Sequence, residues 1–254
     1  MNFLPHFNFW DIILILAVSI QATVIAYVYQ PKWKAFILNL PIPFTFATLA
    51  VGSDINITNV MGLLFLLIFT HLVRMLYYNL KLNIILSIII SAAFYCLIGS
   101  LLAPILPKTT YTFWTTVFVI TVLSAILFYI TPYRAEQGHR SPLPIWIKLP
   151  LVVMVITILI IIKTNLQGFT TVFPMVGVIT AYEARHSLWT ICRQIPIIVL
   201  TILPMMVACR LTQSAIGLKT ALAFSWLAFA AVFVLLTYSM WRNDKVAVYN
   251  LERL

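Results

Sequence analysis

The sequence predicts an all-α polytopic membrane protein, on the evidence of its composition, its hydropathy and the spacing of its apolar residues. Of the 254 residues, 63% are hydrophobic and 9% are charged, whereas about a quarter of the residues in soluble domains are charged. Mean hydropathy is +1.04. The apolar residues gather in runs near the roughly 20 residues that a helix needs to cross a bilayer. We therefore expect membrane-spanning helices and no soluble domain.

Nine such runs follow one another, and the breaks between them carry Pro, Asn, Asp, Lys or Arg. They cover residues 10–29, 34–52, 58–78, 83–105, 110–131, 146–162, 166–183, 188–209 and 219–241. Each has about the length of one spanning helix. The sequence therefore predicts nine transmembrane helices.

The positive charges favour nine spans, with the N-terminus outside and the C-terminus in the cytoplasm. Cytoplasmic segments of membrane proteins carry an excess of Lys and Arg. In this topology twelve such residues face the cytoplasm: Lys32, Lys34, Arg74, Lys81, Arg134, Arg140, Lys148, Arg185, Arg193, Arg242, Lys245 and Arg253. Four face outward: Lys108, Lys163, Arg210 and Lys219. If two of the runs, 34–52 and 166–183, were re-entrant loops instead, the tally would be nine to seven.

The nine runs divide into four, one and four. Residues 1–107 are expected to form a first four-helix membrane unit, 108–144 a linker helix with a cytoplasmic loop, and 145–254 a second four-helix unit with a short cytoplasmic tail. Each unit repeats the same order: an apolar helix, a proline-centred helix and two further spans. Because one extra helix separates the units, the second enters the membrane from the opposite side. We therefore expect an inverted 4+1+4 repeat.

The proline-centred segments, Lys34 to Asp54 and Gln167 to Ser187, are the features that point most directly to a site. Pro43 lies nine residues from both Lys34 and Gly52, and Pro174 lies nine residues from both Asn165 and Glu183. Nine helical residues extend over roughly half of a ~30 Å hydrocarbon core. Interrupted helices at matching positions of two halves indicate a transporter binding site. The competing interpretation is that these prolines only shape helix packing, since proline is common in transmembrane helices.

Polar residues and an arginine near these prolines complete the candidate site. The candidate substrate-binding residues are Asn39, Pro43, Thr45, Pro174, Gly177, Thr180, Glu183 and Arg193. The hydroxyl groups could equally mend the backbone around a kink. Glu183 could belong to an ion cluster at the membrane interface, and Arg193 could reach the surface with its long side chain or bind an anion with its guanidinium fork.

The sequence lacks the patterns of several other functional classes. The net charge of +10 is scattered between apolar runs, so it does not form the basic patch of a nucleic-acid-binding protein. Cys96, Cys192 and Cys209 are isolated, which is not typical of a metal site or a disulfide framework. No hydrolase, metalloprotease or phosphate-loop motif is present. We therefore expect no metal, no cofactor, no nucleic-acid partner and no enzymatic activity.

The second half of the chain resembles a known family. The run KTNLQGFTTVFPMVGVITAYEA is followed by Arg193 near the start of the next helix and by Pro204 within it. With these features the stretch from Ile145 to Arg242 resembles the small four-helix membrane proteins of the GlpM type. The first half is similar only in LPIPFTFATLAVG and has no arginine matching Arg193. The resemblance implies a four-helix unit, here doubled and inverted, and it implies no substrate.

Two functions are compatible with these features. The first is a transporter of the bacterial inner membrane that binds an unidentified small solute between the two proline segments. The alternative is a non-transporting membrane subunit that scaffolds or regulates an envelope enzyme. Flux through the reconstituted protein would indicate the first, and co-purification with one stable partner would indicate the second. Besides the solute, the lipid bilayer is the expected partner.

Overall fold

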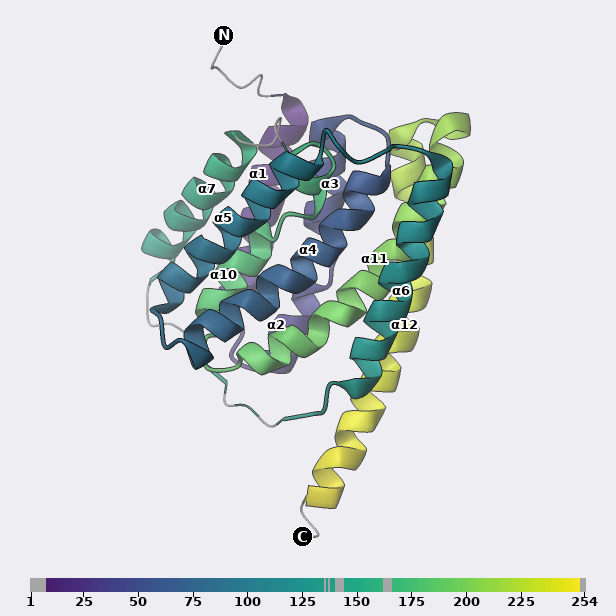
Figure 1. The fold of residues 1–254 in the computed structure, drawn as a ribbon. Helices are drawn as coiled ribbons and strands as arrows, with labels where there is room; N and C mark the ends of the chain where they lie inside the picture. Colours follow the sequence, from purple (N-terminus) through teal and green to yellow (C-terminus); the bar gives the residue numbers. More distant parts are fainter. Residues whose placement is uncertain (1–7, 135, 137, 140–143, 162–165, 252–254) are drawn as a thin grey trace.

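A computed structural model describes residues 8–134, 136, 138–139, 144–161 and 166–251, and within these ranges the regular structure is entirely helical. The chain turns back and forth in a bundle, with the N-terminal end of α1 and the C-terminal end of α12 at opposite ends (Figure 1). The helices are α1 (Phe9–Tyr27), α2 (Pro31–Leu38), α3 (Ile42–Val51), α4 (Ile57–Arg74), the π-helical turn η1 (Met75–Asn79), α5 (Ile84–Leu102), α6 (Thr110–Ile130), α7 (Ile145–Ile161), α9 (Phe169–Val172), α10 (Met175–Glu183), α11 (Leu188–Ile216) and α12 (Leu218–Leu251).

Seven segments among the described residues are long and apolar enough to cross a membrane. They are Phe9–Tyr27, Pro31–Val51, Ile57–Asn79, Ile84–Leu102, Thr110–Ile130, Leu188–Ile216 and Leu218–Arg242. The prediction of an all-helical fold is therefore confirmed for the described residues, and the length and composition of these seven segments fit a membrane protein. The two other expected runs appear as α7, whose 17 residues extend roughly 25 Å, and as the broken pair α9 and α10.

Polar residues fix where several helices begin. The Asn8 side chain accepts a hydrogen bond from the backbone of Asp11, and the Asp11 carboxylate accepts one from the backbone of Asn8. Asn56 and Asn59 make the same reciprocal pair at the start of α4. Thr109 caps α6. These contacts satisfy backbone N–H groups that a helix start leaves free.

Both proline segments are broken into two helices rather than kinked. Pro41 stands at the cap position before α3, and Pro174 stands at the same position before α10. Pro43 is the second residue of α3, where a missing N–H removes no intrahelical bond. Because Pro41 and Pro174 both occupy the cap position before the second helix, the structural counterpart of Pro174 is Pro41 and not Pro43.

Packing separates the interior helices from those that face outward. α4 and α11 run through the middle of the bundle (Figure 1), and α6 and α12 each pack against α11. In the most apolar part of α6, 17% of the residues are buried, whereas in the corresponding part of α11 61% are buried. The exposed side chains of α6 include Phe118, Val119 and Ile126, as expected of a helix that faces lipid.

Candidate functional site

The two broken segments meet around a cavity of about 70 Å³. Leu40, Pro41 and Pro43 line it from the first break, and Phe173 and Pro174 line it from the second. Side chains of α4 and α11 close the remaining sides. Segments about 130 residues apart in sequence thus share one cavity.

The wall of this cavity is almost wholly hydrocarbon. Thr70 and Thr171 are the polar side chains among its lining residues, and both hydroxyls donate to backbone carbonyls of their own chain segment, Thr70 to Leu66 and Thr171 to Gly168. Among the residues that the structure describes, no charged side chain lines it. A ligand in this space would therefore meet aliphatic and aromatic groups and the ends of broken helices.

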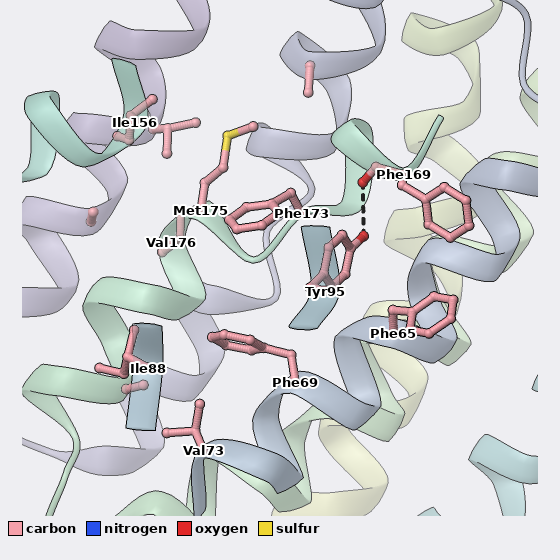
Figure 2. Packing of buried hydrophobic residues seen from close by; sticks show 14 of the residues in the cluster. Phe65, Phe69, Val73, Ile88, Tyr95, Ile156, Phe169, Phe173, Met175 and Val176 are labelled. Atoms are coloured by element: carbon pink, nitrogen blue, oxygen red, sulfur yellow. Dashed lines mark hydrogen bonds between the residues drawn. The ribbon is translucent and has the colours of Figure 1, made fainter. Parts of the chain in front are cut away.

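An aromatic cluster holds α9 against α4 and α5. The Tyr95 hydroxyl donates to the carbonyl of Phe169 at 2.9 Å, and its ring lies edge-on to Phe173 at 5.0 Å between centroids (Figure 2). Phe65 contacts the rings of both Tyr95 and Phe169. Tyr95 is 1% exposed. A buried side chain thus satisfies a carbonyl of a helix too short to satisfy its own.

A second anchor joins the start of α4 to the loop before α9. The Asn59 amide donates to Thr171 Oγ1 at 3.0 Å and to the carbonyl of Gly168 at 3.5 Å. Gly168 packs so closely that a β-carbon there would collide with Thr58 Oγ1 and lie 2.9 Å from the Asn59 backbone nitrogen. Only glycine fits this crossing.

The cavity brings together Pro43, Pro174 and Gly177 of the candidate residues, and the other five lie outside its wall. Thr45 donates to the carbonyl of Pro41 and accepts a hydrogen bond from the Trp226 indole of α12. Thr180 donates to the carbonyl of Val176. Both hydroxyls therefore support the half-helices that border the cavity.

Asn39 is buried at the first break, together with a residue that sequence analysis missed. Asn39 is 1% exposed, and neither its Nδ2 nor its Oδ1 has a hydrogen-bond partner. Gln21 of α1 donates to the carbonyls of Ile37 and Leu40, on either side of Asn39, while its Oε1 also has no partner. The sequence feature that could have identified Gln21 is its position, as a glutamine more than halfway along an otherwise apolar run.

Glu183 and Arg193 lie at one end of the bundle, which we call the charged end because it also carries Lys34, Arg74, Arg134 and Arg185. Lys34 is 1% exposed, and its ammonium group donates to the carbonyls of Glu183 and His139 at 3.0 and 2.8 Å. Arg193 Nε donates to the carbonyl of Thr131 at 3.4 Å. Its guanidinium thus points toward the segment that follows α6 and away from the cavity.

The same end carries a contact network around the start of α11. The Glu136 carboxylate accepts from the backbone nitrogens of Trp189 and Thr190, at 3.2 and 2.6 Å, so it supplies the negative charge that a helix N-terminus favours. The guanidinium groups of Arg74 and Arg134 lie 4.4 and 4.1 Å from the Trp189 ring. These contacts join three parts of the chain: α4, α11 and the segment that follows α6.

His139 belongs to this charged end. Burial, with the positive charges of Arg185 and Lys34 and the neighbouring His186, lowers the pKa of His139 below its usual 6.5. Its ring centroid lies 4.5 Å from that of His186. The surroundings therefore favour the neutral imidazole.

The comparisons with known proteins do not extend this picture. The chain matches no protein-family model, no curated protein and no solved structure. Within the described residues, no group of three or more His, Cys, Asp or Glu side chains lies together as metal ligands would. The geometry alone therefore supports the functional interpretation.

Proposed function

We propose that the protein is a membrane transporter for a small solute, which binds where the two broken segments meet. The observation that carries the proposal is the cavity between the α2–α3 break and the α9–α10 break. Broken helices inside a membrane are tolerated where they line a cavity or are covered by protein. In many transporters, paired broken helices form the substrate site.

An inverted repeat is part of this proposal. α1 packs against its counterpart α7 and α4 against its counterpart α11, and the two broken segments meet through α3 with α9 and through α2 with α10. Such reciprocal contacts are expected of elements that lie close to a two-fold axis relating two halves. Nine passes in a 4+1+4 arrangement, a bacterial inner-membrane location and kinship with GlpM-type proteins belong to the same proposal.

The solute should be small and uncharged. Ligand pockets for drug-sized molecules measure about 300–1,000 Å³, and this cavity is about 70 Å³. Pro41 and Pro43 remove two backbone donors from the first turn of α3, so this half-helix offers little to an anion. The hydrocarbon wall gives no partner to a full charge.

The test is flux through proteoliposomes loaded with a total metabolite extract. Protein-containing vesicles should lose one class of small neutral metabolite faster than protein-free vesicles do. Ala181→Leu places an isobutyl group in the cavity wall and should abolish this loss. Ala93→Leu makes the same change on the exposed side of α5 and should leave it unaltered.

The outcome that contradicts the proposal is equally definite. Equal metabolite profiles with and without protein would reject transport, provided that the reconstituted protein keeps its unfolding midpoint. Equal flux in Ala181→Leu and Ala93→Leu would reject the cavity as the route. Restoring continuous helices with Pro41→Ala and Pro174→Ala should also impair flux more than stability.

One observation favours the alternative of a partner-binding subunit. α12 continues to Leu251, past the Leu218–Arg242 segment that could span a membrane, and its end projects beyond the bundle (Figure 1). Removing residues 244–254 should release a bound partner if α12 recruits one. Unchanged flux in that truncated protein would favour the transporter.

A further inference from the structure

A second space, larger than the central cavity, lies on the other face of α10. It is a groove of about 320 Å³ between α1, α5, α7 and α10. α10 turns Val176, Gly177 and Ala181 toward the central cavity and Val178 and Ile179 toward the groove. This nine-residue half-helix is therefore the wall between the two spaces.

The groove opens sideways, toward the region that lipid would occupy. α5 and α7 each pack against α10 but make little contact with one another among the described residues. Ile85 and Ile89 of α5 line the groove and are 53% and 57% exposed. Its remaining walls are mainly aliphatic, so the groove offers a surface for hydrocarbon.

The groove also lies in one half of the membrane, at the charged end. Its lining residues come from the last turn of α1, the first turns of α5, the middle of α7 and the last six residues of α10. Tyr182 and Glu183, at the end of α10, line it as well. One end of the groove is thus at headgroup depth, and the rest faces acyl chains.

The dimensions fit a single hydrocarbon chain better than a polypeptide. One turn of a helix about 10 Å wide and 5.4 Å high occupies roughly 420 Å³, which exceeds the whole groove. An extended peptide would bring unpaired backbone N–H and C=O groups into an apolar space. Each unpaired group costs about several kcal/mol, as it does in the hydrocarbon core of a bilayer. A lipid acyl chain has no backbone polar groups to pair, and its end can extend past the open side of the groove.

Positive charge at the headgroup end favours an anionic lipid. Arg185 donates to the carbonyl of Tyr182 at 3.2 Å, and its guanidinium lies 5.0 Å from the groove-lining Tyr182 ring. Lys81 is exposed four residues before Ile85. Glu183 is the acidic residue of the groove, and the buried ammonium group of Lys34 lies against its carbonyl.

We propose that this groove binds one acyl chain of an anionic phospholipid from the leaflet at the charged end, with the lipid phosphate held near Arg185. The site stands independently of the transported solute. Because α10 is shared, an acyl chain in the groove supports the wall of the central cavity.

Native mass spectrometry of the detergent-purified full chain tests the site. Phosphatidylglycerol and phosphatidylcholine with identical acyl chains are the probes. One phosphatidylglycerol molecule should stay bound under collisional activation that strips the other lipids. Arg185→Gln should weaken phosphatidylglycerol about fivefold, since one basic residue near an anionic surface contributes about 1 kcal/mol, and should weaken phosphatidylcholine less, because its choline ammonium group offsets the phosphate charge.

Matched variants separate the groove from general lipid contact. Ile89→Trp places an indole over the groove and should abolish the retained lipid. Val119→Trp makes a similar change on α6, at a position that is 55% exposed, and should retain it. Equal retention in both variants would overturn the groove site. Equal retention of the two lipids by the unaltered protein would overturn the choice of an anionic headgroup.

Discussion

At the residue scale, Asn39 is the side chain that packing explains least. Both polar atoms of its amide are buried without a hydrogen-bond partner. Such a group typically costs about 1–3 kcal/mol of stability. Unsatisfied buried groups are rare in native proteins, and each calls for an explanation. Asn39 lies outside the cavity wall, between the lining residues Leu38 and Leu40, so under the proposed function a solute would reach its amide only when the α2–α3 break opens during transport.

Replacing this residue separates stability from function. Asn39→Leu removes the unpaired amide, so we expect the free energy of unfolding in detergent to rise by up to about 1–3 kcal/mol while flux falls. Gln21→Leu is the contrasting change, because Gln21 donates to two carbonyls at the same break, and it should destabilise the protein. Lower stability together with normal flux in Asn39→Leu would show that its amide is a structural group.

His139 gives the protein a pH dependence with a definite sign. Its pKa is lowered in the folded protein, so just below pH 6.5 the unfolded chain binds more protons than the folded one. Stability is therefore fully present above pH 6.5 and is lost as the pH falls below it. Burial and the positive charges of Arg185 and Lys34 lower the pKa of His139, and the negative charge of Glu183 raises it.

The unfolding midpoint between pH 8 and pH 5 measures this effect. The unaltered protein should lose stability below pH 6.5, and His139→Gln, which has no ionisable ring, should lose less over the same range. Parallel curves for the two proteins would assign the pH dependence to other groups.

At the element scale, the second broken segment depends on one close crossing. Gly168 lies against the first turn of α4, beside Thr58 and Asn59. A methyl group there has no room to move aside because the backbone of α4 blocks it. Such overpacking costs about 1–3 kcal/mol, and here it would also displace the Asn59 contact that positions Thr171.

Gly168→Ala should therefore lower stability by roughly 1–3 kcal/mol and reduce flux. Gly99→Ala is the matched control, since its added carbon would meet the end of the Leu166 side chain at 3.1 Å, and that side chain can shift. Chemical unfolding of both variants in detergent provides the measurement. Equal losses in the two variants would mean that the α4 crossing is not the constraint.

The sequence predicted the position of both interrupted elements but not the form of the interruption. Two prolines two residues apart, Pro41 and Pro43, are compatible with a kink or with a new helix start. The structure has a new start, and Thr45 donates its backbone N–H to the carbonyl of Pro41. The choice depends on what covers the freed backbone groups, and side chains such as Gln21 come from other helices.

At the scale of the whole molecule, the expected outcome is nine passes with the C-terminus in the cytoplasm. Reporters fused after Ser53, Lys108 and Lys163 should report the outer side, and reporters after Lys81 and Gly138 the cytoplasm. The physical reason is the excess of Lys and Arg at one end of the bundle. A cytoplasmic signal after both Ser53 and Lys163 would establish that the two broken segments re-enter on the same side.

Several basic residues join segments that are far apart in the chain. Lys34 reaches the carbonyls of His139 and Glu183, and Arg74 and Arg134 share the Trp189 ring. These residues come from segments far apart in the chain, and the sequence analysis assigned all the basic ones to one face of the membrane. The buried Lys34 ammonium group is held there by the two carbonyls rather than by water, which the sequence does not reveal.

The sequence by itself determined the helical membrane class, the approximate run boundaries and the two interrupted segments, because hydropathy and proline act locally along the chain. Only the tertiary structure decided that Pro43, Pro174 and Gly177 share a cavity, whereas Thr45 and Thr180 bond to backbone and Arg193 turns to the segment after α6. Side-chain direction depends on which helices pack together and how closely, and Gly168 and Tyr95 set that closeness through contacts with residues about 110 and 74 positions away.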